Sequence, residues 1–168
     1  MAYTHSASLS ISVEATLQNA ADLSGAKDVL MLAYGLALTT GTGASQANRH
    51  WHERRTLGGG NTYFPELDEI GFDAFGNLVA FATVRALVIA NRNTGAGEVL
   101  RVGGNLDHPW LGWLGLADIA IIGPGGLLVI ASPLSAGMPV ETGEGILQFT
   151  NPNAGALTFD LIIIGSTS

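Results

Sequence analysis

His50 and His52 have the spacing in this sequence that is best suited to metal chemistry. Alternate side chains of a β-strand lie on the same face, so the two imidazoles could bind zinc, with Glu53 or His108 as a further ligand. Glu53, however, would point to the opposite face, and nothing in the sequence brings His108 close. Because zinc requires three or four ligands, we interpret the pair as part of a polar strand face and predict no metal site.

Acidic side chains gather between residues 66 and 73 and could bind calcium or act as paired catalytic carboxylates. They do not follow the alternating carboxylate and glycine pattern of an EF-hand loop, and a glycosidase needs two carboxylates at a defined separation across a cleft. A solvated acidic loop accounts for them. Of the functions that the sequence suggests, a small hydrolase that uses Glu66, Asp68 or Asp73 therefore ranks last. The acidic residues of this segment are Glu66, Asp68, Glu69 and Asp73.

Glycine-rich loops at 41–43 and 123–126 could be taken for phosphate-binding loops. Neither ends in the Lys-Ser/Thr pair of a Walker loop, and neither lies between a strand and a helix. The chain has no G-x-S-x-G nucleophile elbow and no cysteine. We therefore predict no catalytic residue, no cofactor and no enzymatic activity.

Arginine and tryptophan cluster at two places and suggest binding surfaces. Tryptophan buries a large area and arginine makes forked, charge-assisted hydrogen bonds, so both are enriched at interface hot spots. Arg85 lies inside an apolar segment, where a buried charge must find a carboxylate, backbone carbonyls or a subunit interface. Tryptophans that simply belong to the core are the alternative. The candidate interface residues are Arg49, Trp51, Arg54, Arg55, Arg85, Trp110 and Trp113.

The composition indicates one apolar β domain, much of whose surface contacts something other than water. The chain has 168 residues, a net charge of −7, no cysteine, 23 glycines and only 12% charged residues, about half the usual quarter. The negative charge argues against nucleic acid as a partner. We expect no signal peptide, because the N-terminus has no basic region before an apolar stretch, and no membrane segment, because no apolar stretch approaches the ~20 residues of a membrane helix.

Period-two alternation and turn residues predict eight or nine strands and no long amphipathic helix. Residues 9–17 alternate as a half-buried strand, and 29–38 form a buried strand or a short helix, of which we favour the strand. A loop at 19–28 separates them. Asp73 to Asn77 has the composition of a turn. The other predicted strands are 49–57, 78–90, 98–102, 118–122, 127–132, 146–150 and 156–164, with 118–122 and 127–132 forming a hairpin around 123–126. This spacing predicts an all-β, jelly-roll-like antiparallel β-sandwich, a single domain over 1–168 in which 1–8 could be an extended N-terminal arm.

Four ordered motifs resemble a family of tailed-phage virion proteins. They are Trp51-His52-Glu53-Arg54-Arg55-Thr56-Leu57, Asp73-Ala74-Phe75-Gly76-Asn77, Pro124-Gly125-Gly126-Leu127-Leu128 and Phe159-Asp160-Leu161-Ile162-Ile163-Ile164-Gly165. These proteins resemble the capsid cement, or decoration, proteins on the outside of the head. The resemblance implies a jelly roll or similar sandwich, a homotrimer and no enzymatic activity. The triplet Gly58-Gly59-Gly60 and the loop around Trp110 depart from the pattern.

The expected function is therefore that of a structural protein made in the host cytoplasm and placed on the capsid exterior. Its partners would be the major capsid protein and further copies of itself, with Arg49, Trp51, Arg54 and Arg55 as the polar anchor. Strand edges, which must be paired or covered, would support self-association. The alternative is a receptor- or carbohydrate-binding module of a phage tail or head fibre, in which the Trp110 and Trp113 loop would stack on sugars.

Overall fold

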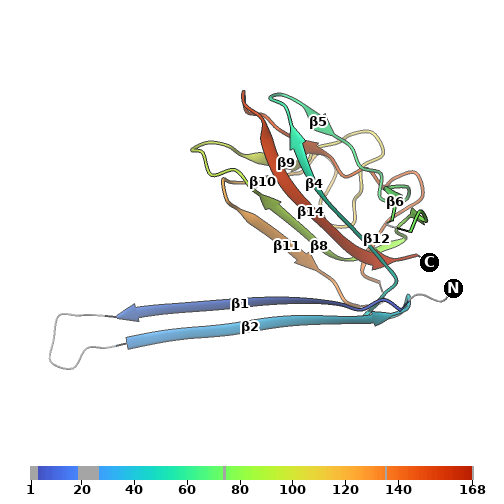
Figure 1. Cartoon of the computed structure of the whole chain (residues 1–168), viewed down its shortest axis with the longest axis horizontal. Coiled ribbons are helices and arrows are strands. Elements are labelled where there is room, and N and C mark those ends of the chain that lie inside the picture. Colours follow the sequence, from blue (N-terminus) through green and yellow to red (C-terminus); the bar gives the residue numbers. More distant parts are fainter. Residues whose placement is uncertain (1–3, 19–26, 74, 135, 168) are drawn as a thin grey trace.

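The computed structural model describes residues 4–18, 27–73, 75–134 and 136–167, and within them the chain is all-β. It consists of a β-sandwich and a long two-stranded hairpin that projects from one end of it (Figure 1). The predicted fold class is thus confirmed for the sandwich. The described residues contain no helix that could cross a membrane.

Two antiparallel sheets form the sandwich. One has the order β11-β8-β14-β4, with the short β12 also paired to β8, and the other has the order β10-β9-β13-β5. Numbered one to eight along the chain, their eight main strands follow the orders 6-3-8-1 and 5-4-7-2, which is the strand order of a jelly roll. The strands of the first sheet are β4 (Arg49–Leu57), β8 (Thr83–Asn91), β11 (Leu127–Ala131), β12 (Met138–Pro139) and β14 (Leu157–Ser166). Those of the second are β5 (Thr62–Tyr63), β9 (Leu100–Gly103), β10 (Ile119–Ile122) and β13 (Phe149–Thr150).

The core lies between the two sheets and is built from the inward-facing positions of their strands. The rings of Phe149 on β13 and Phe159 on β14 stack with centroids 4.7 Å apart and so join one sheet to the other. Leu87, Ile89 and Leu161 contribute from the first sheet and are fully buried. The predicted strand at 49–57 is confirmed residue for residue as β4, and the glycine triplet ends it.

The predicted turn is confirmed at its described residues, 73 and 75–77, and connects β6 (Gly71–Phe72) to β7 (Leu78–Val79). The Asp73 carboxylate accepts hydrogen bonds from the backbone N–H groups of Phe75 and Asn77, at 2.8 and 2.9 Å. Gly76 has a φ of 79°, which glycine adopts without steric cost. These bonds hold the pKa of Asp73 below its usual range.

The strand predicted at 146–150 is present only as β13 at 149–150, and two predictions about the course of the strands are wrong. The strand expected at 78–90 is interrupted at 80–82, because Leu78 and Val79 pair with β6 whereas β8 pairs with β14. The strands on either side of 123–126 exist, but they do not form a hairpin: β10 pairs with β9, and β11 pairs with β8 in the opposite sheet. Local turn residues indicate that the chain turns, but they do not determine which strand the next segment pairs with.

The projecting hairpin is formed by β1 (Ala7–Gln18) and β2 (Lys27–Thr40). Residues 29–38 are therefore a strand, as we favoured, but the predicted burial of this strand is wrong. Most of its apolar side chains are exposed, and only Leu38, next to the sandwich, is buried. Residues 19–26 of the predicted loop, and residues 1–3 of the predicted N-terminal arm, lie outside the described residues.

Candidate interaction surfaces

The joint between hairpin and sandwich is held by backbone hydrogen bonds. The short strand β3 (Gln46–Ala47) pairs in parallel with the end of β2. Ser45 donates its N–H to the Pro133 carbonyl at 2.7 Å, and Asn48 donates to the Gly165 carbonyl at 3.1 Å. The Asn48 side chain also exchanges hydrogen bonds with Thr167. These contacts fix the direction in which the hairpin leaves the sandwich.

Arg85 reinforces the same joint from inside the protein. It is 1% exposed, and its guanidinium donates to the carbonyls of Leu134, Thr42 and Gly43, the last two at 3.0 and 3.3 Å. The prediction that a buried arginine here must find carbonyls or another partner is confirmed. Within this chain, Arg85 ties the loop that follows β2 to the sandwich; its role at an interface between subunits stays a prediction.

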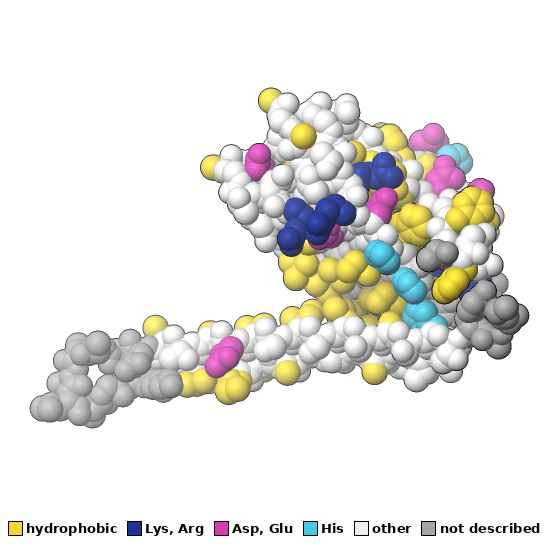
Figure 2. Space-filling view, in the orientation of Figure 1, with side chains coloured by type: hydrophobic (Ala, Val, Ile, Leu, Met, Phe, Trp, Pro, Cys, Tyr) yellow, Lys and Arg dark blue, Asp and Glu magenta, His cyan; other side chains and the backbone are white. Residues whose placement is uncertain are grey.

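The outer face of the sheet β11-β8-β14-β4 is apolar next to the joint. Two rows of side chains cross it, Val129, Val88 and Ile162 in one and Ala131, Ala86 and Ile164 in the next. Ile162 is 39% exposed. Hydrophobic side chains lie on both sides of the gap between this end of the sandwich and the hairpin (Figure 2). The sheet therefore carries apolar side chains on both of its faces, of which only the inner one contacts the core.

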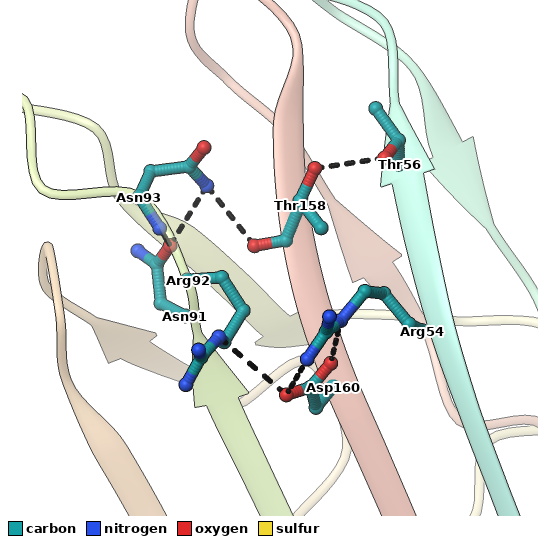
Figure 3. Close-up of polar contacts among 7 residues, drawn as sticks. All are labelled: Arg54, Thr56, Asn91, Arg92, Asn93, Thr158 and Asp160. Carbon is teal, nitrogen blue, oxygen red and sulfur yellow. Dashed lines mark hydrogen bonds and ion pairs between the residues drawn. The ribbon is translucent and has the colours of Figure 1, made fainter.

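The far end of this outer face is polar. Arg54 on β4 donates from Nε and Nη2 to the two carboxylate oxygens of Asp160 on β14, at 2.6 and 3.0 Å. Arg92 lies 3.6 Å from the same carboxylate (Figure 3). The two hydrogen bonds from Arg54, with the charges of Arg54 and Arg92, hold the pKa of Asp160 below its usual range. Two cations around one anion leave a local excess of positive charge on a protein whose net charge is −7.

The structure divides the four predicted anchor residues between two sheet faces. Arg54 points outward, whereas Arg49, Trp51 and Arg55 lie on the opposite face of β4 and are half-buried. Trp51 packs against the core and so closely against Gly71 that a Cβ there would lie 2.9 Å from its ring. Arg55 pairs with Glu53 at 3.2 Å. The anchor can therefore not be a single patch on one face.

Arg55 also covers the ring of Tyr63, with its guanidinium carbon 3.6 Å from the ring centroid. Burial, together with the nearby Glu53, raises the pKa of Tyr63 to about 12. Arg49 donates from Nη1 to the Asn48 carbonyl at 2.9 Å, beside the joint. The inner-face arginines thus already have partners within the chain.

The two loop tryptophans contribute to the interior. Trp110 is 4% exposed and belongs to the core, and its indole N–H donates to the Pro139 carbonyl at 2.7 Å. Trp113 is partly buried and packs against the same core. Of the two interpretations that the sequence left open for the tryptophans, membership of the core is the one that describes Trp110 and Trp113 in the isolated chain. A shallow hollow of about 300 Å³ lies beside Trp110 and is lined by Leu111, Pro139, Glu141 and Glu144 among others.

The histidines of β4 lie where the outer sheet face meets the hairpin. The rings of His50 and His52 stack with centroids 6.1 Å apart, and His50 Nδ1 lies 3.3 Å from Nε2 of His5. His5 is held at the hairpin base by hydrogen bonds with Thr40. Burial, and then the proximity of His50, lower the pKa of His5. In the described part of the chain, no group of three or more histidine or acidic side chains is arranged to hold a metal ion.

His108 is instead part of an exposed acidic environment. Its Nδ1 lies 3.2 Å from the Glu144 carboxylate, and its Nε2 lies 3.4 Å from Asp107. The bond with Glu144 and the charges of both carboxylates raise the pKa of His108. It is not brought to His50 and His52 as a ligand.

Two Asn-x-Asn brackets, each with a buried first asparagine, were not singled out from the sequence. In the first, Asn91 donates to the carbonyls of Glu98, Ile122 and Gly123 and accepts from the backbone N–H and side chain of Asn93. In the second, Asn151 donates to the carbonyls of Leu57, Gly58 and Gly155 and accepts from the backbone N–H and side chain of Asn153. The repeated Asn-x-Asn spacing is the feature of the sequence that could have revealed them. Both brackets satisfy loop carbonyls that would otherwise be buried without donors.

Comparisons of this chain with protein-family models, with curated proteins and with solved structures found no match.

Proposed function

We propose that this protein is a non-enzymatic virion structural protein, a capsid cement or decoration protein that stabilises a phage head by binding major capsid subunits. The observation that carries the proposal is the projecting hairpin, whose apolar face is exposed along most of its length, as is expected of a subunit that functions in an assembly with other protein chains. Monomeric soluble proteins rarely expose long contiguous apolar surfaces, and such surfaces are characteristic of protein–protein contacts. The resemblance of the sequence motifs to tailed-phage virion proteins supports the same function.

The chemistry of the charged groups agrees with an adhesive role. The shifted pKa values of Asp73, Asp160 and His108 are explained by a turn, an ion pair and a surface contact. The exposed cluster of Arg54, Arg92 and Asp160 offers local positive charge to an acidic surface of a capsid subunit. Several linked copies, each with one such modest contact, would dissociate far more slowly than a single copy.

A reconstruction of the assembled virion tests the proposal by locating the protein. We expect density for the sandwich on the outside of the head, in contact with major capsid subunits. Binding of the purified protein to heads that lack it provides the second measurement. Arg54→Ala should weaken this binding by about tenfold, whereas Arg101→Ala, an exposed arginine on the other sheet, should not. A position in the tail, or equal binding by both variants, would contradict the capsid-anchor proposal.

The hollow beside Trp110 supports a second candidate, a receptor- or carbohydrate-binding module. Its carboxylates, Glu141 and Glu144, could bind sugar hydroxyls, but the buried Trp110 ring has little free face for stacking. A glycan array separates the candidates. Because Trp110→Ala would damage the core, the test variants are Leu111→Ala and Glu144→Gln. A saccharide that binds the wild type and is lost in both variants would favour the receptor function.

A further inference from the structure

One face of the hairpin is apolar from its base to Ala15 and Leu30, and near the tip Leu17 pairs with Asp28 on this face. In the antiparallel register, Leu9 pairs with Leu36, Ile11 with Tyr34, Val13 with Leu32 and Ala15 with Leu30. The other face carries mostly small and polar residues, among them Ser10, Ser12 and Glu14, and its large apolar side chains are Val29 and Met31. Exposure on the apolar face is 3% at Leu38, beside the sandwich, and reaches 62% at Tyr34 and 44% at Leu32. The face is thus covered at its base and open beyond it.

A two-stranded hairpin is marginally stable in water by itself. The twelve residues of β1 extend about 40 Å, well past the sandwich (Figure 1). An extended ribbon with this much exposed apolar surface requires a partner. The partner must present a flat apolar surface, because the hairpin itself is a small sheet.

The same chain carries such a surface. The outer face of β11-β8-β14 presents Val129, Val88, Ile162, Ala131 and Ile164 next to the joint, whereas Ala86 among them is buried and Asp160, farther along β14, is ion-paired with Arg54. The joint holds the hairpin away from this face in its own subunit through Arg85, Ser45 and Asn48. The hairpin of one copy and the sheet of another are not limited in this way.

We propose that the apolar face of the hairpin packs on the outer face of the sheet β11-β8-β14-β4 of a second copy of this chain. Each copy then provides a hairpin and receives one, either by mutual exchange between two copies or around a closed ring. A ribbon about 30 Å long and 10 Å wide buries at most roughly 600 Å² over its two surfaces in flat projection, because the apolar part of the receiving face ends before the ion pair of Arg54 and Asp160. Giving and receiving doubles this to at most about 1,200 Å², the lower limit of standard stable interfaces. The contact does not depend on what the assembled protein binds.

Neighbouring residues on opposite faces of β2 allow a matched test. Leu32→Lys places a charge on the apolar face, and Met31→Lys places the same charge on the other face, where the side chain is 72% exposed. Ile162→Lys charges the receiving sheet, and Ile119→Lys charges the outer face of the opposite sheet as its control. Light scattering with size exclusion gives the mass of the full chain, and circular dichroism verifies folding.

We expect an oligomer for the wild type, Met31→Lys and Ile119→Lys, and a dissociation constant at least about tenfold higher for Leu32→Lys and Ile162→Lys. A wild type that stays monomeric up to about 100 μM, or oligomers that neither substitution weakens, would overturn the proposal.

Cross-linking identifies the surfaces directly, because the chain has no native cysteine. Mixed Leu32→Cys and Ile162→Cys proteins should form a disulfide-linked heterodimer in preference to either homodimer. Homodimers of Leu32→Cys alone would show that hairpins pack on each other, which would overturn the assignment of the receiving sheet. If the Leu32→Cys protein bound phosphatidylcholine vesicles and formed no cross-link between copies, the assignment of a second copy as the occupant would be overturned.

Discussion

Leu38 and Leu32 lie on the same face of β2, six residues apart, but Leu38 is 3% exposed and Leu32 is 44% exposed. The two leucines have the same local conformation and similar neighbours along the strand. Their difference comes from the angle at which the hairpin leaves the sandwich, which brings only the base of the hairpin against the body of the protein. This angle creates the open apolar surface on which both proposals rest.

Leu38→Ala should destabilise the isolated chain and Leu32→Ala should not. Removing a buried leucine leaves a cavity and costs about 2–4 kcal/mol of the free energy of unfolding. An exposed position changes it by about 0.5 kcal/mol or less. Urea unfolding, at protein concentrations low enough to keep the copies apart, measures both free-energy changes. Equal effects would mean that the hairpin base is not buried as described.

Arg85→Met should loosen the joint. The substitution keeps an unbranched apolar side chain but leaves the carbonyls of Thr42, Gly43 and Leu134 without their donor, at a cost of about 1–3 kcal/mol. Hydrogen exchange should accelerate at the Ser45 amide, which bonds across the joint to Pro133. The amide of Phe159, inside the sandwich, serves as the control and should be affected much less. Unchanged exchange at Ser45 would show that Arg85 does not secure the hairpin.

Asn151→Ala should cost about 2–4 kcal/mol of stability, because the buried carbonyls of Leu57, Gly58 and Gly155 lose one shared donor. Asn77→Ala, in the exposed turn at Asp73, should cost about 1 kcal/mol or less. Thermal unfolding of both variants makes the comparison. If the two variants melt alike, the bracket contributes little.

The pKa values of His5 and His108 should lie on opposite sides of the ordinary histidine value of 6.5, that of His5 below it and that of His108 above it. His5, with a lowered pKa, stays neutral in the folded state while the unfolded chain is protonated, so its contribution to stability falls as the pH drops below 6.5. His108, with a raised pKa, contributes below 6.5 and loses that contribution as the pH rises through its folded pKa. NMR titration measures both. Glu144→Gln should bring the pKa of His108 down toward 6.5 and leave His5 unchanged.

Arg54→Ala should raise the pKa of Asp160 toward its ordinary value while changing stability at neutral pH little, because Arg54 is exposed and solvent screens the pair. In the wild type, the lowered pKa of Asp160 adds stability above its unfolded pKa, and this is lost as the pH falls through the folded value. Acid unfolding followed by carboxylate NMR tests this. A large loss of stability at pH 7 would contradict the placement of Arg54 as a surface residue available for binding.

Local sequence patterns were sufficient for several elements. Alternation and the glycine triplet give the bounds of β4, and Asp73, Gly76 and Asn77 specify their turn, because these features depend on residues close in the chain. The need of Arg85 for carbonyl partners also follows from the cost of a buried charge. Which carbonyls accept the hydrogen bonds of Arg85 cannot be predicted in this way, because Thr42 and Leu134 are distant from Arg85 in the sequence.

The alternating residues of β1 determine that the strand has an apolar face, and strand spacing determines the all-β class. Only the tertiary structure decides what that face contacts, which of Trp51 and Arg54 points outward, and that the strands flanking 123–126 join different sheets. Periodicity is a property of neighbouring residues, whereas burial depends on surfaces that distant segments bring together. Beyond its base, the hairpin meets no such segment among the described residues, so a face that the sequence pattern predicts to be buried is exposed.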